Sequence, residues 1–258
     1  MGLKERPLQT GIIYGPVNSR RLGRSLGINL LPTETKVCTF DCVYCQYGAN
    51  LGLYDPATVG RLGLPTSEQV RVALEKTLAG LDALDVITLA GNGEPTLHPE
   101  FAGIARSAAE LRDRFCSGAP ICILSNGSTL DNESVRLALE KYVDRRIMKL
   151  DAGTRSAFQQ VNRPAGGLQL DTLVEHLAAL KDVEVQSLFF EGPHSNAGSG
   201  DIARWLDLLE RIAPGSVQVY SLDRTPADKS LRPVSRERLE EIAGQVRQQL
   251  PRTGVQVF

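Results

Sequence analysis

The stretch LGINLLPTETKVCTFDCVYCQYG, residues 26–48, decides how the rest of the chain is interpreted. Its opening run, 26–31, is apolar and predicts a buried β-strand. The segment that follows carries Cys38, Cys42 and Cys45 in the spacing C-x3-C-x2-C. In α/β proteins the functional residues gather on loops at the carboxyl ends of parallel strands. The cysteines therefore mark a candidate site at the end of a strand.

The cysteine spacing favours an iron–sulfur cluster over other uses of thiols. Three thiolates on one short loop can bind three corners of a cubane, and a missing fourth ligand leaves one iron open to the amino and carboxylate groups of a substrate. A structural zinc knuckle would need a fourth Cys or His at short range, which the neighbouring sequence lacks. Chance burial of small apolar thiols is the remaining alternative. We expect the other two cysteines, Cys116 and Cys122, to be buried structural residues.

Composition places the chain among ordinary globular proteins. It has 258 residues, of which 42% are hydrophobic and 23% are charged. The formal net charge of -1 gives no global basic field for nucleic acid or an anionic membrane. The N-terminus lacks the apolar core of a signal peptide, and no apolar run approaches the ~18 residues needed to span a bilayer. We expect a cytoplasmic protein with reduced thiols and no membrane partner.

Predicted strands and helices alternate along the chain, which indicates an α/β domain with a parallel sheet, either doubly wound or a partial barrel. We treat residues 1–258 as a single domain, with 46–65 as a loop over the site. The apolar runs that predict strands are 26–31, 86–90, 121–125, 146–150, 183–190 and 216–222. The stretches with helical periodicity are 67–80, 100–115, 131–142, 168–181, 200–213 and 235–249.

The cysteine motif, with Tyr44 before its last cysteine, resembles that of the radical S-adenosylmethionine (SAM) superfamily. The segments GPVNSRRLGRSLGINLLP and KVCTFDCVYCQYG resemble the branch related to the wyosine-forming tRNA enzymes. Further matching segments are GNGEPTLHPEF, ILSNGS, KLDAG and the NRP at 162–164. The resemblance covers nearly the whole chain. It implies a partial (β/α)6 barrel of the radical SAM type, with a [4Fe–4S] cluster and SAM as cofactors.

The segment after the second predicted strand is the first candidate for holding SAM. Its glycines allow a ligand to approach the backbone, and Glu94 offers an acceptor for an ammonium group. The resemblance implies that this segment binds the methionine amino group of SAM, whereas a plain β–α turn is the alternative. The residues concerned are Gly91, Asn92, Gly93 and Glu94.

Later strand ends supply the other candidate cofactor residues. Lys149 and Asp151 share one face of a strand, and an inward pair of this kind is costly to bury unless it is paired or binds a ligand. The resemblance implies contacts with the ribose, carboxylate or adenine of SAM; turn-forming or core roles are the alternatives. The full set is Tyr44, Ser125, Asn126, Lys149, Asp151, Tyr220 and Leu222.

Substrate-binding candidates are weaker, because arginines suit phosphate or carboxylate recognition but are also common as solvated surface charges. Arg21, Arg24 and the loop residue His194 carry the same ambiguity. The candidate substrate-binding residues are Arg20, Arg163, Asn196 and Arg224.

The function that follows is reductive cleavage of SAM to a 5′-deoxyadenosyl radical, which acts on an unidentified small-molecule or peptide substrate. An external one-electron donor such as flavodoxin or ferredoxin is expected as a partner. The alternative is tRNA base modification related to wyosine synthesis. Against it stand the neutral charge and the absence of cysteines upstream of Cys38 for a second cluster. A non-catalytic electron carrier is disfavoured, because it would need no cofactor pocket.

Overall fold

The computed structural model describes residues 6–52 and 54–258, which form two units. The N-terminal unit consists of 8–39, 50–52 and 54–147, and the C-terminal unit of 6–7, 40–49 and 148–258. The cysteine loop runs through both units, because Cys38 belongs to the first and Phe40–Ala49 to the second. The expectation of one domain over 1–258 remains a prediction.

Strands of the N-terminal unit begin with an antiparallel hairpin, β1 (Ile13–Ser19) and β2 (Gly23–Ile28). Parallel strands β3 (Val86–Leu89) and β4 (Ile121–Ser125) continue the order from β2. Their side chains are almost entirely buried, as expected for parallel strands covered by helices. β5 (Arg145–Lys149) then carries the chain into the C-terminal unit.

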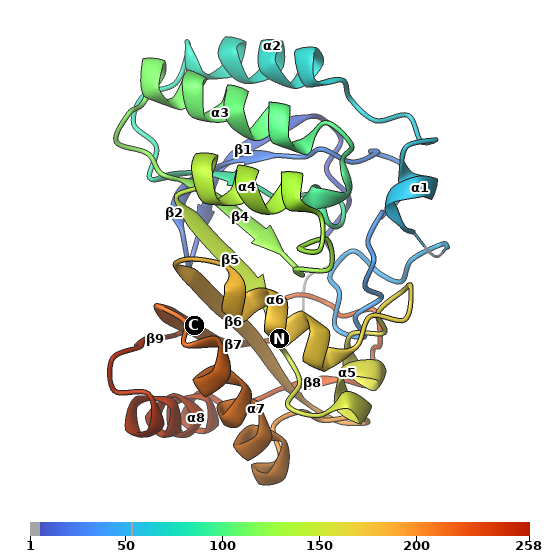
Figure 1. The fold of residues 1–258 in the computed structure, drawn as a ribbon, viewed down its shortest axis with the longest axis vertical. Helices are drawn as coiled ribbons and strands as arrows, with labels where there is room; N and C mark the ends of the chain where they lie inside the picture. Colours follow the sequence, from blue (N-terminus) through green and yellow to red (C-terminus); the bar gives the residue numbers. More distant parts are fainter. Residues whose placement is uncertain (1–5, 53) are drawn as a thin grey trace. The chain divides into compact units, whose positions relative to one another are not determined.

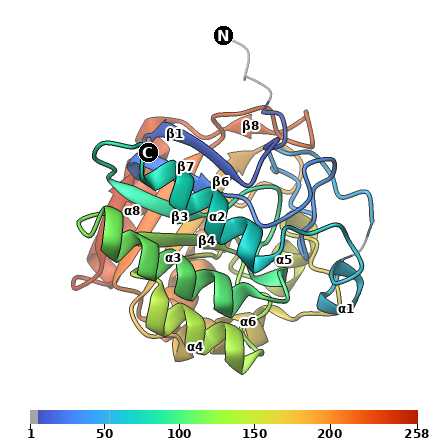
Figure 2. The same ribbon diagram turned by 90° about the horizontal axis from the view of Figure 1, so that it is seen from above.

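Helices of the N-terminal unit cover these strands. α3 (Phe101–Phe115) packs between α2 (Ser67–Leu78) and α4 (Glu133–Tyr142), and the three lie side by side in Figures 1 and 2. α2 begins with a capping box in which Thr66 accepts from the backbone of Gln69 and the Gln69 side chain accepts in return. Short elements complete this unit: helix α1 (Pro56–Val59) and the 3-10 turn η1 (Pro95–Leu97).

The C-terminal unit repeats the strand–helix alternation. β6 (Val183–Glu191), β7 (Ser216–Ser221) and β9 (Gly254–Val257) are parallel neighbours in that order, and β8 (Arg232–Pro233) pairs antiparallel with β6. α7 (Ser199–Ile212) packs between α6 (Leu170–Ala179) and α8 (Arg236–Gln249), and α5 (Arg155–Val161) packs against α6 (Figure 1).

The six strands and six helices predicted from periodicity are all present, so the α/β prediction is confirmed. The first predicted strand is displaced. It runs over Gly23–Ile28 rather than 26–31, because residues 23–28 are the ones that pair with β1 in the hairpin. The stretch 46–65 is not entirely a loop, since Asp55 caps helix α1 within it; Leu53 lies outside the described residues. Strands β1, β8 and β9 and helices α1 and α5 were not predicted.

Candidate cofactor site

The turn after β3 positions the start of the cysteine loop in the N-terminal unit. Val37 lies beside Gly93 in a parallel bridge: its N–H donates to the Asn92 carbonyl at 2.8 Å, and its carbonyl accepts from the Glu94 N–H at 3.0 Å. Gly93 has a φ of 145°, and a Cβ there would collide with the Val37 carbonyl. The glycine is therefore required so that the turn and the chain just before Cys38 can pair.

Glu94 is a carboxylate that is only 2% exposed. Its Oε1 accepts hydrogen bonds from the Thr96 Oγ1 (2.6 Å), the Ser125 Oγ (2.8 Å) and the Thr96 N–H (3.1 Å). Its Oε2 accepts from the Asn126 N–H at 2.7 Å. No Lys, Arg or His among the described residues pairs with it, and burial raises its pKa although these hydrogen bonds oppose the rise. The carboxyl group therefore has hydrogen-bond donors but no counter-ion in the described part of the chain, and a cation beside it would stabilise its ionised form.

Asn126, at the end of β4, connects Glu94 with the first cysteine. Its side-chain Nδ2 donates to the Cys38 sulfur at 3.5 Å and to the Thr39 Oγ1 at 2.9 Å. Its Oδ1 accepts from the Ser128 N–H at 2.9 Å, an Asx turn. The predicted residues Ser125 and Asn126 thus lie against Glu94 and the cysteine loop, as the strand-end rule suggests.

Asn92 and Gly91 have structural contacts instead. The Asn92 amide donates to the carbonyls of Gln9 (2.9 Å) and Pro32 (2.8 Å), and its oxygen accepts from the Gln9 N–H. A Cβ on Gly91 would meet the side chain of Asn29. The Asn92 side chain therefore holds neighbouring backbone together and has its polar atoms occupied.

In the C-terminal unit a buried carboxylate, Asp151, anchors the second part of the cysteine loop. Its Oδ1 pairs with the Lys149 ammonium at 2.9 Å and accepts from the Leu188 N–H at 2.8 Å. Its Oδ2 accepts from the Tyr44 hydroxyl and from the Asn162 Nδ2 at 2.9 Å. Four donors satisfy this carboxylate, so its role here is to fix Tyr44 and the loop around it.

Lys149 lies between two aromatic rings. Its ammonium is 5.1 Å from the Tyr44 ring centroid and 4.9 Å from that of Tyr220, and it donates to the Tyr220 hydroxyl at 2.7 Å. Burial opposes its charge, but the Asp151 carboxylate and the Tyr220 hydroxyl outweigh it and raise the pKa. Lys149 is therefore a fixed cation, with a side chain still 16% exposed.

Cys42 lies close to the Asp151 carboxylate and the Asn162 amide. Burial, and next the Asp151 carboxylate, raise the pKa of Cys42 to about 12. The Asn162 Nδ2 donates to its sulfur at 3.4 Å. Asn162 was not among the predicted site residues; the NRP segment at 162–164 is the signal that could have identified it.

The predicted substrate residues lie on separate segments of the chain. Asn196 is 2% exposed and its amide donates to the carbonyls of Asp151 and Leu188, so it closes a loop against the strand ends. Arg163 is exposed; hydrogen bonds from Ser230 lower the pKa of Asp228 most, and the Arg163 charge lowers it further. Arg224 pairs with Asp223 at 3.8 Å.

Two further predicted residues, Arg20 and Leu222, lie apart from the contacts described above. Arg20 lies in the β1–β2 turn, at the amino end of β2, whereas the cysteine loop follows the carboxyl end of that strand. It is therefore at the wrong edge of this unit to join Glu94 and Asn126. Leu222 is a core residue, packed in the cluster that holds Val43 and Phe190, with Tyr220 at its margin.

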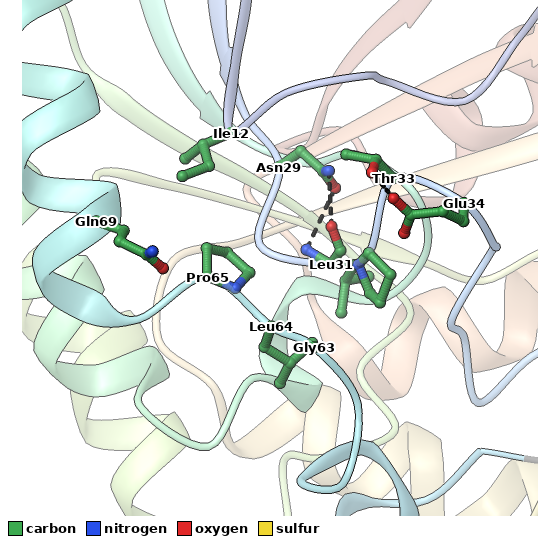
Figure 3. A pocket seen from close by; sticks show the side chains of 10 residues that line it. Ile12, Asn29, Leu31, Thr33, Glu34, Gly63, Leu64, Pro65 and Gln69 are labelled. Carbon is green, nitrogen blue, oxygen red and sulfur yellow. Dashed lines mark hydrogen bonds between the residues drawn. The ribbon is translucent and has the colours of Figure 1, made fainter.

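A pocket of about 370 Å³ opens elsewhere in the N-terminal unit (Figure 3). It lies between the segment after β2, which includes Asn29 and Leu31, and the residues that lead into α2, Gly63–Pro65. None of the predicted site residues lines it. Across residues 6–52 and 54–258, no group of three His, Cys, Asp or Glu side chains is arranged to hold a metal ion, and all five cysteines are free thiols.

Comparison with known proteins assigns the family. The Radical SAM superfamily model matches residues 34–192, so the chain belongs to the radical SAM superfamily and is an enzyme of that class. A relative in Methanocaldococcus jannaschii, a UPF0026 protein, is 30% identical over 236 residues, covering 90% of this chain and 70% of that protein. Within the superfamily the chain is thus a member of the UPF0026 family.

A second relative, described as GTPase Obg of Brachyspira hyodysenteriae, is 27% identical over 237 residues. The match covers 91% of this chain and 33% of that protein, so the chain spans about a third of its length.

Solved structures show the same fold. A radical SAM methyltransferase from Sphaerobacter thermophilus has a TM-score of 0.65 at 16% identity, covering 90% of this chain and 66% of that one. Streptococcus suis SuiB, bound to its precursor peptide SuiA, has a TM-score of 0.64 at 13% identity, covering 89% of this chain and 48% of that one. TYW1 with a lysine–pyruvate adduct has a TM-score of 0.57 at 15% identity, covering 87% of this chain and 73% of that one. The predicted fold, a partial (β/α)6 barrel of the radical SAM type, is confirmed.

Superfamily membership establishes the cofactors, a [4Fe–4S] cluster and SAM, and with them a need for an electron donor and a substrate. The residues present fit both groups: free thiols supply the cluster, amide N–H groups face two of the sulfurs, and Glu94 lacks a cation. As to membranes, helices long and apolar enough to cross one do not occur in the described part of the chain.

Proposed function

We propose that Cys38, Cys42 and Cys45 are the ligands of the [4Fe–4S] cluster, and that the enzyme forms a 5′-deoxyadenosyl radical to act on a small molecule or peptide. When bound, the cluster and SAM supply one-electron cleavage of a carbon–sulfur bond. The chain's own residues bind the cofactors, orient them and exclude water.

The observation that carries this proposal is the unpaired carboxylate of Glu94. Four hydrogen bonds fix its two oxygens, and burial raises its pKa, so an ammonium group beside it would restore the ordinary stability of the ionised form. The amino group of SAM is such a cation. Ser125 and Asn126 hold the carboxylate in one orientation for it.

Lys149 is proposed to bind the carboxylate group of SAM. It is a fixed cation, and Asp151 and Tyr220 use two of the three hydrogens of its ammonium. Asp151 acts on the cofactors indirectly, by orienting Lys149 and Tyr44.

The test compares two cysteine variants after anaerobic reconstitution. We expect the natural chain to bind about four irons and Cys42→Ala to lose the cluster, because a cubane requires its thiolate ligands. Cys116→Ala is the matched control, since that thiol lies at the end of α3, and its iron content should equal that of the natural chain. Reduction with dithionite and SAM should release 5′-deoxyadenosine. Bound zinc in place of iron would contradict the proposal.

The electron donor is proposed to be a flavodoxin or ferredoxin, and the location the cytoplasm. The alternative substrate class is tRNA, which the resemblance to wyosine-forming enzymes favours. It would be supported by a salt-sensitive complex with tRNA. An electron-carrier function would be supported by a reducible cluster that releases no 5′-deoxyadenosine.

A further inference from the structure

Asn162 lies where the cysteine loop meets helix α5. It follows the last residue of that helix, and its backbone N–H donates to the Phe158 carbonyl at 2.9 Å. Its own carbonyl accepts from the Asp41 N–H at 3.0 Å, and the neighbouring Val161 carbonyl accepts from the Val43 N–H at 2.9 Å. Helix α5 thereby fixes the backbone on both sides of Cys42, and the side chain of Asn162 is fixed with it.

That side chain is 1% exposed and uses its nitrogen twice. Nδ2 donates to the Cys42 sulfur at 3.4 Å and to the Asp151 Oδ2 at 2.9 Å. The Lys149 ammonium and the Leu188 N–H donate to Oδ1 of the same carboxylate and the Tyr44 hydroxyl donates to Oδ2, so Asp151 accepts from every partner around it. The amide must present N–H groups to it, so the opposite amide orientation would place oxygen against oxygen. One hydrogen goes to the carboxylate and the other to the sulfur.

The amide oxygen of Asn162 makes no hydrogen bond with the described residues that would stabilise the fold. Oδ1 of Asn162 is buried and has no hydrogen-bond partner among the described residues. An unsatisfied buried acceptor is unfavourable. Leucine has nearly the same shape and would avoid that loss, so the benefit of asparagine lies in its two N–H groups.

An N–H group directed at a ligand sulfur changes the reduction potential of an iron–sulfur cluster. Hydrogen bonds to the sulfurs are among the factors that set cluster reduction potentials. The bond strengthens as the sulfur becomes more negative, so it stabilises the reduced state more than the oxidised state. The nearby Asp151 carboxylate is paired with the Lys149 ammonium at 2.9 Å, so its charge is balanced within the protein and opposes the added electron only weakly.

We propose that Asn162 is a positioning residue that raises the reduction potential of the cluster through its hydrogen bond to Cys42. This inference rests on the proposed function, since it requires Cys42 to ligate the cluster. Its effect is on how readily the cluster accepts an electron, before any substrate is bound.

The test is an anaerobic redox titration of the reconstituted full chain, followed by electron paramagnetic resonance without SAM or substrate. Asn162→Leu keeps the shape and removes both N–H groups; Asn162→Asp keeps the shape and adds a negative charge. We expect roughly a tenfold smaller ratio of reduced to oxidised cluster at a fixed solution potential in N162L, which is a midpoint ~59 mV lower for one electron. The midpoint of N162D should be lower still.

Thr154→Ala is the structural control. The Thr154 Oγ1 caps the other end of helix α5 by accepting from the Ala157 N–H at 3.1 Å, and among the described residues no hydrogen bond joins it to a thiol. This variant loosens the same helix, so its midpoint should match that of the natural chain. Midpoints of N162L and N162D equal to that of T154A would overturn the inference. Failure of the natural chain to bind iron would instead overturn the proposed function.

A second measurement, in which Asn162 is unchanged, covers the case in which neither Asn162 variant folds. With asparagine labelled by ¹⁵N, the reduced cluster should show a hyperfine coupling to an amide nitrogen in pulsed spectra. Asn126, which donates to Cys38, contributes a coupling of its own, so Asn126→Leu serves as the background. A labelled spectrum of N126L without any asparagine coupling would overturn the inference.

Discussion

At the scale of single residues, the two buried carboxylates have opposite electrostatic surroundings. Asp151 has Lys149 at 2.9 Å and so is neutralised within the protein. Glu94 has only neutral N–H and O–H donors, which orient a carboxylate but do not balance its charge. A ligand cation therefore gains much more from Glu94 than from Asp151.

The first prediction is that Glu94→Gln weakens SAM binding. The variant keeps the length of the side chain and removes its charge, and hydrogen bonds to charged groups are worth about 1.5–3 kcal/mol. We expect Kd for SAM to rise roughly 10–100-fold, measured by calorimetry on cluster-loaded protein. Glu100→Gln is the control, because that exposed carboxylate accepts from Ser67 at the start of α2. Equal affinities in both variants would refute the assignment.

The raised pKa of Glu94 also predicts a pH dependence of stability. In the ligand-free fold this group holds its proton to higher pH than in the unfolded chain, so folding takes up a proton in that interval. The stabilisation is complete below the unfolded pKa and is lost as pH rises through the folded pKa. The difference in unfolding free energy between the natural chain and E94Q should fall with rising pH over that window. Urea titrations at several pH values measure it; a rising difference would contradict the prediction.

Residue chemistry explains which site residues could be predicted. Ser125 and Lys149 end strands β4 and β5, Asn126 follows β4, and Glu94 lies in the turn after β3, so the sequence places all four with their strands. Asn162 and Asn196 follow a short helix and a loop, where their partners are set by distant backbone, so sequence alone cannot tell a sulfur contact from a backbone contact. Arg20 stays a prediction; the structure places it in the β1–β2 turn, at the amino end of the strand that begins at Gly23.

At the scale of elements, the bridge between Val37 and Gly93 connects the β3 turn to the cysteine loop. We predict that Gly93→Ala disrupts it, because φ is 145° and the new Cβ would meet the Val37 carbonyl. The expected loss of unfolding free energy is about 2 kcal/mol or more, measured in urea. Gly103→Ala is the control: within α3 its Cβ meets nothing within 4 Å, and helix propensity favours alanine by roughly 0.5–1 kcal/mol. An unfolding free energy of G93A equal to that of the natural chain would show that the bridge is dispensable.

Element prediction succeeded where periodicity was long and failed where it was short or interrupted. The helix predicted over 100–115 is observed as Phe101–Phe115 because its apolar positions recur over several turns. β1 contains Gly15 and Pro16, which indicate a turn, and its register with β2 shifts there. β9 spans only Gly254–Val257, too short for alternation to stand out. Its identity depends on pairing with β7, which is tertiary information.

At the scale of the whole molecule, charges are balanced and mostly local. Lys and Arg total 29 against 30 Asp and Glu. Many exposed arginines pair with carboxylates one helical turn away, as Arg71 does with Glu68 and Glu75, and Arg236 with Glu240. Such pairing neutralises the helix faces on which a phosphate backbone would need a continuous basic stripe.

The last prediction therefore concerns tRNA. We expect the full chain to bind bulk tRNA no more tightly than the non-specific range, with Kd of about 1 μM or weaker at physiological salt. Fluorescence anisotropy at several salt concentrations measures both the affinity and its salt slope. The charge-reversal pair Glu240→Lys with Glu241→Lys changes the net charge from -1 to +3, since each reversal adds two charges. Binding by this variant, with a steeper salt slope, would demonstrate that the assay detects a basic face on α8. A sub-micromolar, salt-sensitive complex with the natural chain would instead favour tRNA modification over a small-molecule or peptide substrate.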